Sequence, residues 1–446
     1  MQDGIDSRYA WLRLSVTLAL MTIGATGMFV ISVAMPAVQA DFGIDRSSVS
    51  MPYTLLMIGF GIGGILMGRL ADRFGVAVPV AIGAFGLGGG FIAAALSPGI
   101  VTFGIVHGIL IGLLGTSATF SPLVADTSLW FERRRGLAVA ICASGNYLGG
   151  AFWPPIVQHF IETVGWRQTY IGIGVMCLVT MLPLSLLLRR RPPGVVKTAP
   201  AGPGPTAGSP VATAVPSQVG KAGEPGQAWQ AGQAGQAGQT GPLRPLGMSP
   251  AALQTLLCIA GVACCVAMAM PQVHIVAYCS DLGFGPARGA QMLALMLGFG
   301  VISRLASGWI SDRIGGLRTL LLGSILQGLA LLLFLPFDGL ASLYVISALF
   351  GLFQGGIVPS YALIIRENFP PSQAGGRVAV VISSTLLGMA LGGWMSGAVF
   401  DYTGSYHAAF INGVAWNLLN LTIAVLLLRR AMRLPGRGLP PVAVAA

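Results

Sequence analysis

The chain has 446 residues, of which 54% are hydrophobic and only 9% are charged, and its mean hydropathy is +0.78. A water-soluble protein of this length would lack the polar side chains needed to cover its surface, so the composition excludes a soluble enzyme and indicates that lipid surrounds most of the chain. The formal net charge of +11 could point to nucleic acid, but its meaning depends on where the cations lie.

Apolar stretches long enough to cross a membrane recur along the whole chain. A helix needs roughly 20 such residues to cross a hydrocarbon core about 30 Å thick. These stretches begin near Leu14, Val49, Gly75, Ile100, Gly136, Gln168, Ala251, Ala290, Thr319, Leu340, Val378 and Ala408. We therefore expect about twelve spans. The first, Leu14 to Pro36, is longer than the apolar part of a secretory leader and lacks a convincing cleavage site, so we expect it to be retained.

The cations between these stretches are distributed unevenly. If the N-terminus is cytoplasmic, the loops on that side contain Arg8, Arg13, Arg69, Arg73, Arg133, Arg134, Arg135, Arg189, Arg190, Arg191, Lys197, Lys221, Arg244, Arg313, Arg318, Arg366, Arg377, Arg429, Arg430, Arg433 and Arg437. The opposite loops contain only Arg46, Arg167 and Arg288. This is the positive-inside pattern, in which basic loops face anionic lipid and not nucleic acid. We expect a multi-pass protein of a bacterial inner membrane with both termini in the cytoplasm.

Between Pro192 and Met248 the composition changes abruptly to Gly, Pro, Ala, Ser and Gln. Such a segment cannot bury enough apolar surface to order itself, so we expect a disordered cytoplasmic linker that serves as a tether. The predicted organisation is a six-helix half at 1–191, the linker at 192–248, a second six-helix half at 249–432 and a cytoplasmic tail at 433–446.

The two halves share sequence features at nearly constant spacing. GRLADRFG at 68–75 recurs 240 positions later as GWISDRIG at 308–315. GNYLGG at 145–150 recurs 243 positions later as GMALGG at 388–393, and the turn at Gly165 corresponds to Gly404, 239 positions later. Because each half has an even number of spans, both halves have the same orientation, and we expect two parallel repeats about an axis along the membrane normal.

These residues resemble the major facilitator superfamily over the whole chain apart from the linker and the extreme termini. The resemblance implies an all-α integral membrane protein with the major facilitator fold, about twelve transmembrane helices in two parallel six-helix repeats. It also implies that the two repeated loops control closure on the cytoplasmic side, through Gly68, Asp72, Arg73, Gly75, Gly308, Asp312 and Arg313. An acidic and a basic residue in such a loop can form contacts in one conformation and lose them in another. The alternative is that these loops only anchor the topology.

Three further segments resemble the monocarboxylate transporter and oxalate/formate antiporter branch of that superfamily. They are WFERRRGLA at 130–138, GNYLGG at 145–150 and GWR at 165–167. The resemblance implies transport of a small organic anion, with a proton or by exchange, through rocker-switch alternating access between the two halves.

Arg304 is the cation that we expect well inside a span. An arginine at that depth costs about 2.5 to 3.5 kcal/mol on insertion scales, so it should face a cavity or a partner. Its neighbours within a turn form a small-residue face of Gly300, Ser307, Gly308 and Ser311. A guanidinium presents paired donors that match a carboxylate, and the branch carries a substrate-binding arginine in its eighth span, where this residue lies. The alternative is that Arg304 snorkels toward the interface. The branch often carries a lysine in the first or eleventh span, and none occurs in either here, which favours a mono-anionic ligand.

Other polar and aromatic residues could complete the binding site. They are Asn146 and Trp153 on one helical face and the adjacent Tyr147. Gln354 and Tyr361 are seven residues apart and therefore lie on one face of a helix. His274 lies near Pro271, where a broken helix could open a binding niche. Each could instead serve helix packing.

Proton coupling needs a group that titrates near neutrality, and the candidates are His107, His274 and Asp126. Asp126 could instead pair with the cluster Arg133–Arg135, and a protonated substrate could itself carry the proton.

We therefore expect a secondary active transporter of a small organic anion, in particular a monocarboxylate, that works as a monomer. One alternative is efflux of apolar or cationic compounds by the same fold, and another is a membrane sensor or enzyme without transport activity. We expect no cofactor and no metal, because no phosphate-binding loop of the type GxxxxGK[ST] occurs and the six cysteines form no metal-binding pattern.

Overall fold

The computed structural model of the chain describes residues 5–191 and 245–433, all of whose regular elements are helices. Most of the predicted linker, residues 192–244, lies outside this range, as do the first four residues and the tail after Arg433. The end of the predicted linker contains a short 3-10 turn at Pro245–Gly247.

The N-terminal half contains six spans. The first is α1 (Arg8–Gly24) with α2 (Thr26–Phe42), and then come α3 (Arg46–Phe74) and α4 (Ala77–Ala95). The fourth span consists of α5 (Ile100–Val106), the π-helix η1 (His107–Thr116) and α6 (Ser121–Leu129). The last two are α7 (Arg135–Val164) and α8 (Trp166–Leu187).

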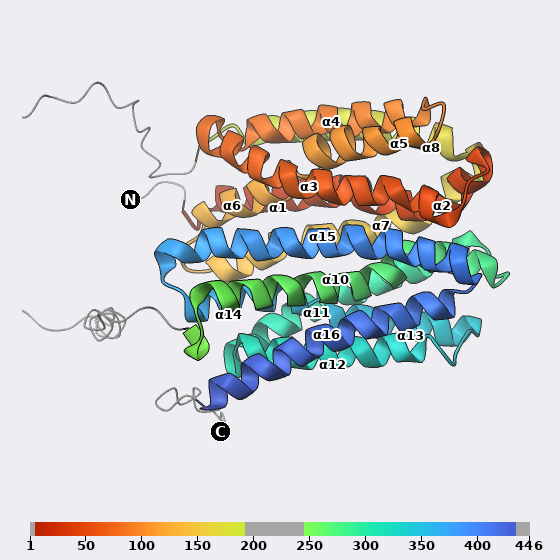
Figure 1. Cartoon of the computed structure of the whole chain (residues 1–446). Coiled ribbons are helices and arrows are strands. Elements are labelled where there is room, and N and C mark those ends of the chain that lie inside the picture. The colour runs from red at the N-terminus through yellow and green to blue at the C-terminus, as the bar shows by residue number, and fades with distance from the viewer. Residues whose placement is uncertain (1–4, 192–244, 434–446) are drawn as a thin grey trace, which may run out of the picture. The chain divides into compact units, whose positions relative to one another are not determined.

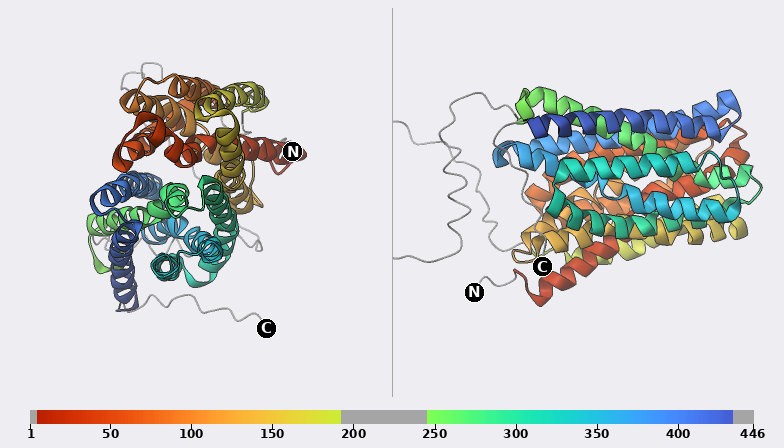
Figure 2. Two further views of the ribbon diagram at one scale, coloured as in Figure 1. Left: turned by 90° about the vertical axis from the view of Figure 1, so that its right-hand side faces the viewer. Right: turned by 90° about the horizontal axis from the view of Figure 1, so that it is seen from below.

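The C-terminal half repeats this order. It contains α10 (Pro250–Asp281), α11 (Pro286–Ile314) and α12 (Gly316–Leu333). The next span is α13 (Leu340–Gln354) with α14 (Ile357–Asn368), followed by α15 (Pro371–Thr403) and α16 (Tyr406–Arg433). In Figure 1 the first half lies above the second with all helices side by side, and Figure 2 shows the two bundles end on.

Eleven of these spans are long and apolar enough to cross a membrane. The exception is α7, whose 30 residues would reach about 45 Å but include several glycines, two prolines and polar side chains. This helix packs against α1 and α11, so much of its surface faces protein and not lipid.

The repeated glycines confirm the duplication in three dimensions. Gly75 and Gly315 end α3 and α11 with φ of 87° and 80°, and Gly165 and Gly404 also have positive φ. Gly149 and Gly392 lie against the first span of their own half. The next residue in each repeat reaches the other half: Gly150 packs on Leu297 of α11, and Gly393 packs on Tyr53 of α3. The halves therefore meet along two equivalent seams, α7 with α11 and α15 with α3.

Two spans are interrupted at equivalent places. The fourth is broken at Ser117–Phe120, and the tenth is broken at Gly355–Gly356. The prediction of one helical face for Gln354 and Tyr361 is therefore wrong, because they lie on different helices. A break near Pro271, which the sequence left open, does not occur, since α10 continues as one helix from Pro250 to Asp281.

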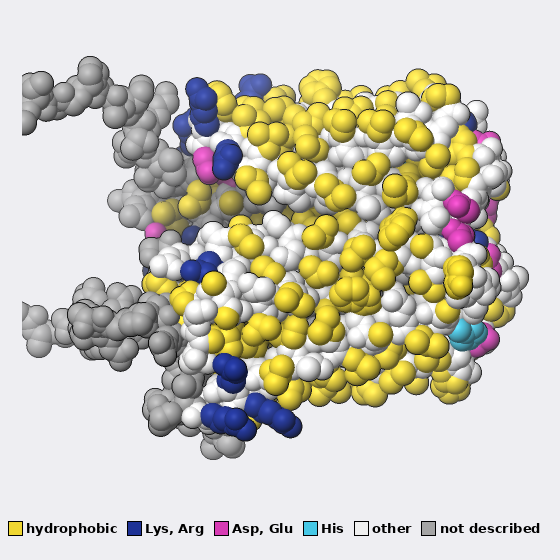
Figure 3. Space-filling view, in the orientation of Figure 1, with side chains coloured by type: hydrophobic (Ala, Val, Ile, Leu, Met, Phe, Trp, Pro, Cys, Tyr) yellow, Lys and Arg dark blue, Asp and Glu magenta, His cyan; other side chains and the backbone are white. Residues whose placement is uncertain are grey.

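Charge separates the two ends of the bundle (Figure 3). The arginine-rich end, where α3, α11 and α16 finish, carries Arg73, Arg313 and Arg430, while the aspartate-rich end carries Asp41, Asp45, Asp281, Asp338 and Asp401. One assignment from the sequence is wrong: Arg13 is not a loop residue but lies within α1, where it is 4% exposed. Which end faces the cytoplasm stays a prediction.

Some helices of the bundle touch at a glycine, where there is no room for a side chain, and this leads to a stability prediction. A Cβ at Gly351 of α13 would overlap the Met296 carbonyl oxygen of α11. We expect Gly351→Ala to lower the free energy of unfolding by about 1–3 kcal/mol, measured as a lower melting temperature in detergent. Gly172 of α8 is exposed and has no neighbour within 4 Å of its Cβ position, so Gly172→Ala is the matched control and should not destabilise. Equal melting temperatures for the two variants would contradict this packing.

Candidate functional site

Arg304 lies on the face of α11 that meets α7 of the other half. Its Nη1 donates a hydrogen bond to the Ala143 carbonyl oxygen at 3.3 Å, and its Cζ lies 4.5 Å from the centre of the Tyr147 ring. Its Nε is buried and has no hydrogen-bond partner among the described residues. The guanidinium therefore points into the seam and keeps an unused donor there.

Tyr147 reaches this cation because α11 has a glycine one turn before Arg304. A Cβ at Gly300 would lie 2.5 Å from Cδ1 and Cε1 of Tyr147, so a side chain at this position would displace the ring. The ring thus contacts Gly300 and Arg304, which lie on the same helical face. A cation over an aromatic ring gains about 0.5–2 kcal/mol, which offsets part of the cost of placing arginine in a membrane.

Gln354 is the last residue of α13, which packs against α11 within the C-terminal half. Its neighbour Gly355 packs against the Gly300 carbonyl oxygen and Ser303. The Oε1 atom of Gln354 accepts a hydrogen bond from Gln272 Nε2 at 3.0 Å, while its own Nε2 is buried and has no partner among the described residues. A second unused donor therefore lies on the chain segment that packs beside Arg304.

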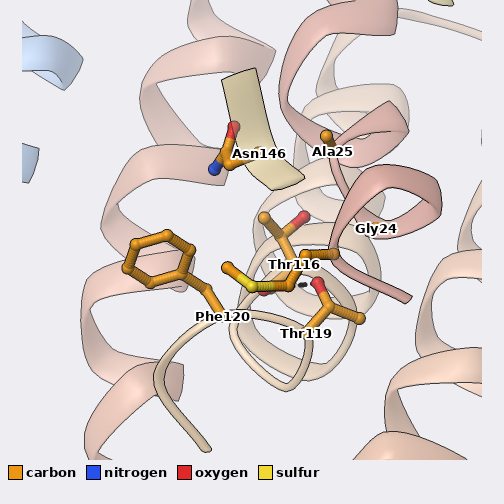
Figure 4. A pocket seen from close by; sticks show the side chains of 7 residues that line it. Gly24, Ala25, Thr116, Thr119, Phe120 and Asn146 are labelled. Carbon is orange, nitrogen blue, oxygen red and sulfur yellow. Dashed lines mark hydrogen bonds between the residues drawn. The ribbon is translucent and has the colours of Figure 1, made fainter. Parts of the chain in front are cut away.

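Asn146 lines a different space, a narrow crevice inside the N-terminal half that has no room for a water molecule (Figure 4). Thr116, Thr119 and Phe120 from the interrupted fourth span line it together with Gly24 of the first span. Thr119 Oγ1 donates to the Thr116 carbonyl oxygen at 3.0 Å, while Thr116 Oγ1 is buried without a partner in the described part of the chain. The crevice therefore combines an amide and an unused hydroxyl.

The other three predicted binding residues make contacts within their own halves. Trp153 Nε1 donates to the Thr22 carbonyl oxygen at 2.7 Å, and Tyr361 Oη donates to Asn420 Oδ1 at 2.9 Å. His274 Nε2 lies 2.8 Å from the Gly393 carbonyl oxygen, so it carries the proton and leaves Nδ1 to accept from Tyr406 Oη at 3.2 Å. The structure does not bring these side chains into contact with Arg304.

The other two candidates for proton coupling, His107 and Asp126, have different surroundings. Asp126 forms an ion pair with Arg13 at 2.9 Å and not with the Arg133–Arg135 cluster, and the two side chains are 8% and 3% exposed. His107 is buried, its Nδ1 lies 2.8 Å from the Phe103 carbonyl oxygen, and its Nε2 has no partner among the described residues. Both lie within the N-terminal half, and neither contacts Arg304.

The predicted gating loops lie at the arginine-rich end of the bundle. The side chains of Asp72, Arg73, Asp312 and Arg313 are exposed, and none of them joins an ion pair in the described part of the chain. Gly68 and Gly308 have no neighbour within 4 Å of their Cβ positions. Gly75 and Gly315 end their helices with positive φ.

The opposite end is closed by a contact that the sequence reasoning missed. Arg46, the first residue of α3, donates from Nη2 to both carboxylate oxygens of Asp281 at 3.1 Å. The backbone N–H groups of Arg46 and Ser47 donate to the Asp401 carboxylate at 2.9 and 2.7 Å. A carboxylate from one half therefore caps a helix of the other. We call these four residues the aspartate-end lock. The signal was available, since Arg46 is one of only three cations predicted on that side.

The start of α3 carries a second carboxylate of its own. Asp45, in the loop before the helix, accepts a hydrogen bond from the backbone N–H of Ser48 at 3.0 Å. Hydrogen bonds from the Ser48 side chain and backbone lower the pKa of Asp45, because they stabilise its ionised form. Two carboxylates, Asp45 and Asp401, therefore neutralise the positive end of the α3 dipole.

Comparison with known proteins identifies relatives over most of the chain. It is 26% identical over 373 residues to the uncharacterized MFS-type transporter YcxA of Bacillus subtilis, with 82% of each protein covered. It is 24% identical over 392 residues to monocarboxylate transporter 13 of Rattus norvegicus, covering 85% of this chain and 78% of that one. A crystal structure of the peptide transporter POT in complex with sulfate has a TM-score of 0.70 at 15% identity, covering 95% and 94% of the two chains, and so shares the fold.

The family model of the Major Facilitator Superfamily matches residues 17–345 and also residues 257–442. These ranges include both six-helix halves and both seams. The duplicated helices, the repeated glycine contacts and this match agree, and the chain belongs to the major facilitator superfamily of membrane transporters.

Proposed function

We propose that this protein carries a small organic anion, in particular a monocarboxylate, across the membrane by alternating access, with Arg304 as the residue that binds the carboxylate. The observation that carries the proposal is the position of this guanidinium. It lies where the two halves meet, and its Nε donor has no partner in the described structure. Two parallel N–H groups match the two oxygens of a carboxylate.

The relatives support this class of substrate. They include monocarboxylate transporter 13 of Rattus norvegicus and of Bos taurus, matched over 78% and 75% of their lengths. Arg304 lies in the eighth span of this chain. Arg304 forms no ion pair in the described part of the chain, so a single negative charge is sufficient to neutralise it. A dicarboxylate would leave its second charge without a partner there.

The remaining ligand contacts are proposed from the unused polar groups. Tyr147 orients the guanidinium, and Gln354 Nε2 is the second donor at the same turn of α11. Asn146 is one residue from Tyr147 and would contact a polar substituent of the ligand. Trp153, His274 and Tyr361 are proposed to position helices within their halves, because their polar atoms are already paired.

The proposed cycle starts from the conformation described here. The aspartate-end lock holds the halves together at one end, while the gating loops at the other end form no ion pair in the described part of the chain. Ligand would enter from the arginine-rich end, and closure there would follow opening of the lock. Transport of cations is less well supported, because Asp126, the buried carboxylate among the described spans, is already paired with Arg13.

The first prediction concerns ligand binding. A thermal-shift panel of mono-, di- and tricarboxylates with the purified protein should identify a monocarboxylate that raises the melting temperature. Arg304→Gln should then weaken binding of that ligand roughly 30-fold or more, since loss of a buried charge partner costs about 2–5 kcal/mol. Arg304→Lys should bind this ligand more weakly than the original chain and more tightly than Arg304→Gln, because lysine keeps the charge and loses the paired donors.

The matched control for this experiment is Arg288→Gln. Arg288 is exposed in the first turn of the same helix, so its loss should leave ligand binding unchanged. Counterflow of the labelled ligand in proteoliposomes, with and without a pH gradient, would separate proton coupling from exchange. Full counterflow by Arg304→Gln would remove this arginine from the mechanism.

The second prediction concerns the aspartate-end lock. Arg46→Gln removes the ion pair between the halves, so the population with an open aspartate-rich end should rise on the order of tenfold or more. Spin labels at Val164→Cys and Asp338→Cys, exposed residues of opposite halves at this end, would report the change as a longer distance.

The control for the lock is a second ion pair at the same end. Arg167 pairs with Asp41 at 2.9 Å, and both residues belong to the N-terminal half. Arg167→Gln should therefore leave the distance distribution unchanged. If Arg46→Gln and Arg167→Gln give the same distribution, the lock does not hold the halves together.

A further inference from the structure

The two seams differ on the side that faces the membrane. On the seam between α3 and α15, an apolar groove of about 220 Å³ lies between the helices. Ile58, Gly61, Ile62 and Ile65 of α3 form one wall, and Leu386 and Leu387 of α15 contribute to the other. Ile58, Ile62, Ile65 and Leu387 are exposed, and because the helices cross the membrane, lipid tails surround them.

The groove lies along one part of this seam. From the aspartate-rich end, α3 contacts α15 through Tyr53 with Gly393, through the hydrogen bond from Thr54 to the Ala390 carbonyl oxygen, and near Gly61 and Leu386. Nearer the arginine-rich end Gly64 lies near Ser121 of α6, and no atom lies within 4 Å of the Cβ position of Gly68. The groove therefore lies between the two halves, on the part of the seam that leads toward the arginine-rich end.

A cation continues the exposed wall of the groove. Ile58, Ile62, Ile65 and Arg69 follow one another at spacings of four, three and four residues, which places them on one face of α3. Arg69 is exposed, lies one turn nearer the arginine-rich end than Ile65, and belongs to none of the ion pairs formed by the described residues. An apolar slot thus ends at an unpaired positive charge.

The equivalent seam lacks this combination. The repeat offset of 240 places Trp309 of α11 at the position of Arg69, and the guanidinium of Arg313 lies 3.5 Å from the centre of that ring. The cation on α11 is therefore packed on an aromatic side chain of its own helix. The pairing of a groove with a free arginine belongs to the α3–α15 seam.

We propose that this groove binds one anionic phospholipid, with an acyl chain between α3 and α15 and the phosphate at Arg69. Figure 3 presents this face, where hydrophobic side chains cover the middle of the bundle and Lys and Arg side chains gather at one end. An acyl chain matches the apolar walls, and the phosphate supplies the charge that Arg69 lacks. The proposal concerns lipid and does not depend on the identity of the transported substrate.

Native mass spectrometry of the delipidated, full-length protein tests the proposal. Palmitoyl-oleoyl phosphatidylglycerol should bind at least about fivefold more tightly than phosphatidylcholine with the same chains, because one arginine near an anionic headgroup is worth about 1 kcal/mol. Arg69→Gln should remove this preference. Ile62→Trp, which fills the groove at an exposed position, should weaken binding of both lipids.

The matched control is Arg430→Gln, at the same end of the bundle but on α16. It should keep the lipid preference of the original chain. Equal affinity of the original chain for the two lipids would overturn the proposal, as would equal effects of Arg69→Gln and Arg430→Gln or unchanged binding by Ile62→Trp. Melting temperatures of all variants establish that they remain folded.

Discussion

A permanent charge inside the membrane imposes the main constraint on this structure. Such a charge needs a cavity or protein groups beside it, and the Tyr147 ring and the Ala143 carbonyl oxygen contact the guanidinium of Arg304 from the opposite half. This contact explains the glycine at position 300, which leaves room for the ring. It also couples the proposed ligand to the seam, because a carboxylate bound to Arg304 would compete with Ala143 for the same donors. A ligand that shifts this contact has the differential interaction that a conformational change requires.

Duplication explains the framework, and departures from it explain where the chemistry lies. The repeat places Gly150 and Gly393 at equivalent contacts between the halves, so the two seams share one packing solution. At other positions the repeat diverges: the offset of 240 pairs Arg304 with Gly64, and it pairs Trp309 with Arg69. One seam thus places its cation in the interior, and the other places its cation on the membrane face. Because the scaffold is symmetric and its side chains are not, the protein can bind a ligand at one seam while both halves rotate around the bound ligand.

Periodic and compositional features of the sequence were sufficient to predict the fold. Long apolar stretches, repeated glycines and alternating basic loops are local properties, and they predicted the helices and the duplication, although α7 is less apolar than the other spans. Contacts between distant residues could not be predicted in this way. The burial of Arg13 against Asp126 and the pairing of Arg46 with Asp281 depend on which helices become neighbours. Gln354 and Tyr361 lie on different helices, because a turn at Gly355–Gly356 interrupts the single helix on which their spacing had placed them.

The exposure of the ion pairs distinguishes rigid from movable parts of the bundle. Arg13 and Asp126 join helices of one half and are 3% and 8% exposed, so separating them would leave two buried charges without water or a partner. Arg46 and Asp281 join the two halves at the end of the bundle, and their side chains are 9% and 36% exposed. When this second pair separates, water can reach the charges, so separating it costs less than separating the pair inside one half. The same type of interaction therefore fixes the inside of a half where it is buried and forms a reversible contact between halves where water reaches it.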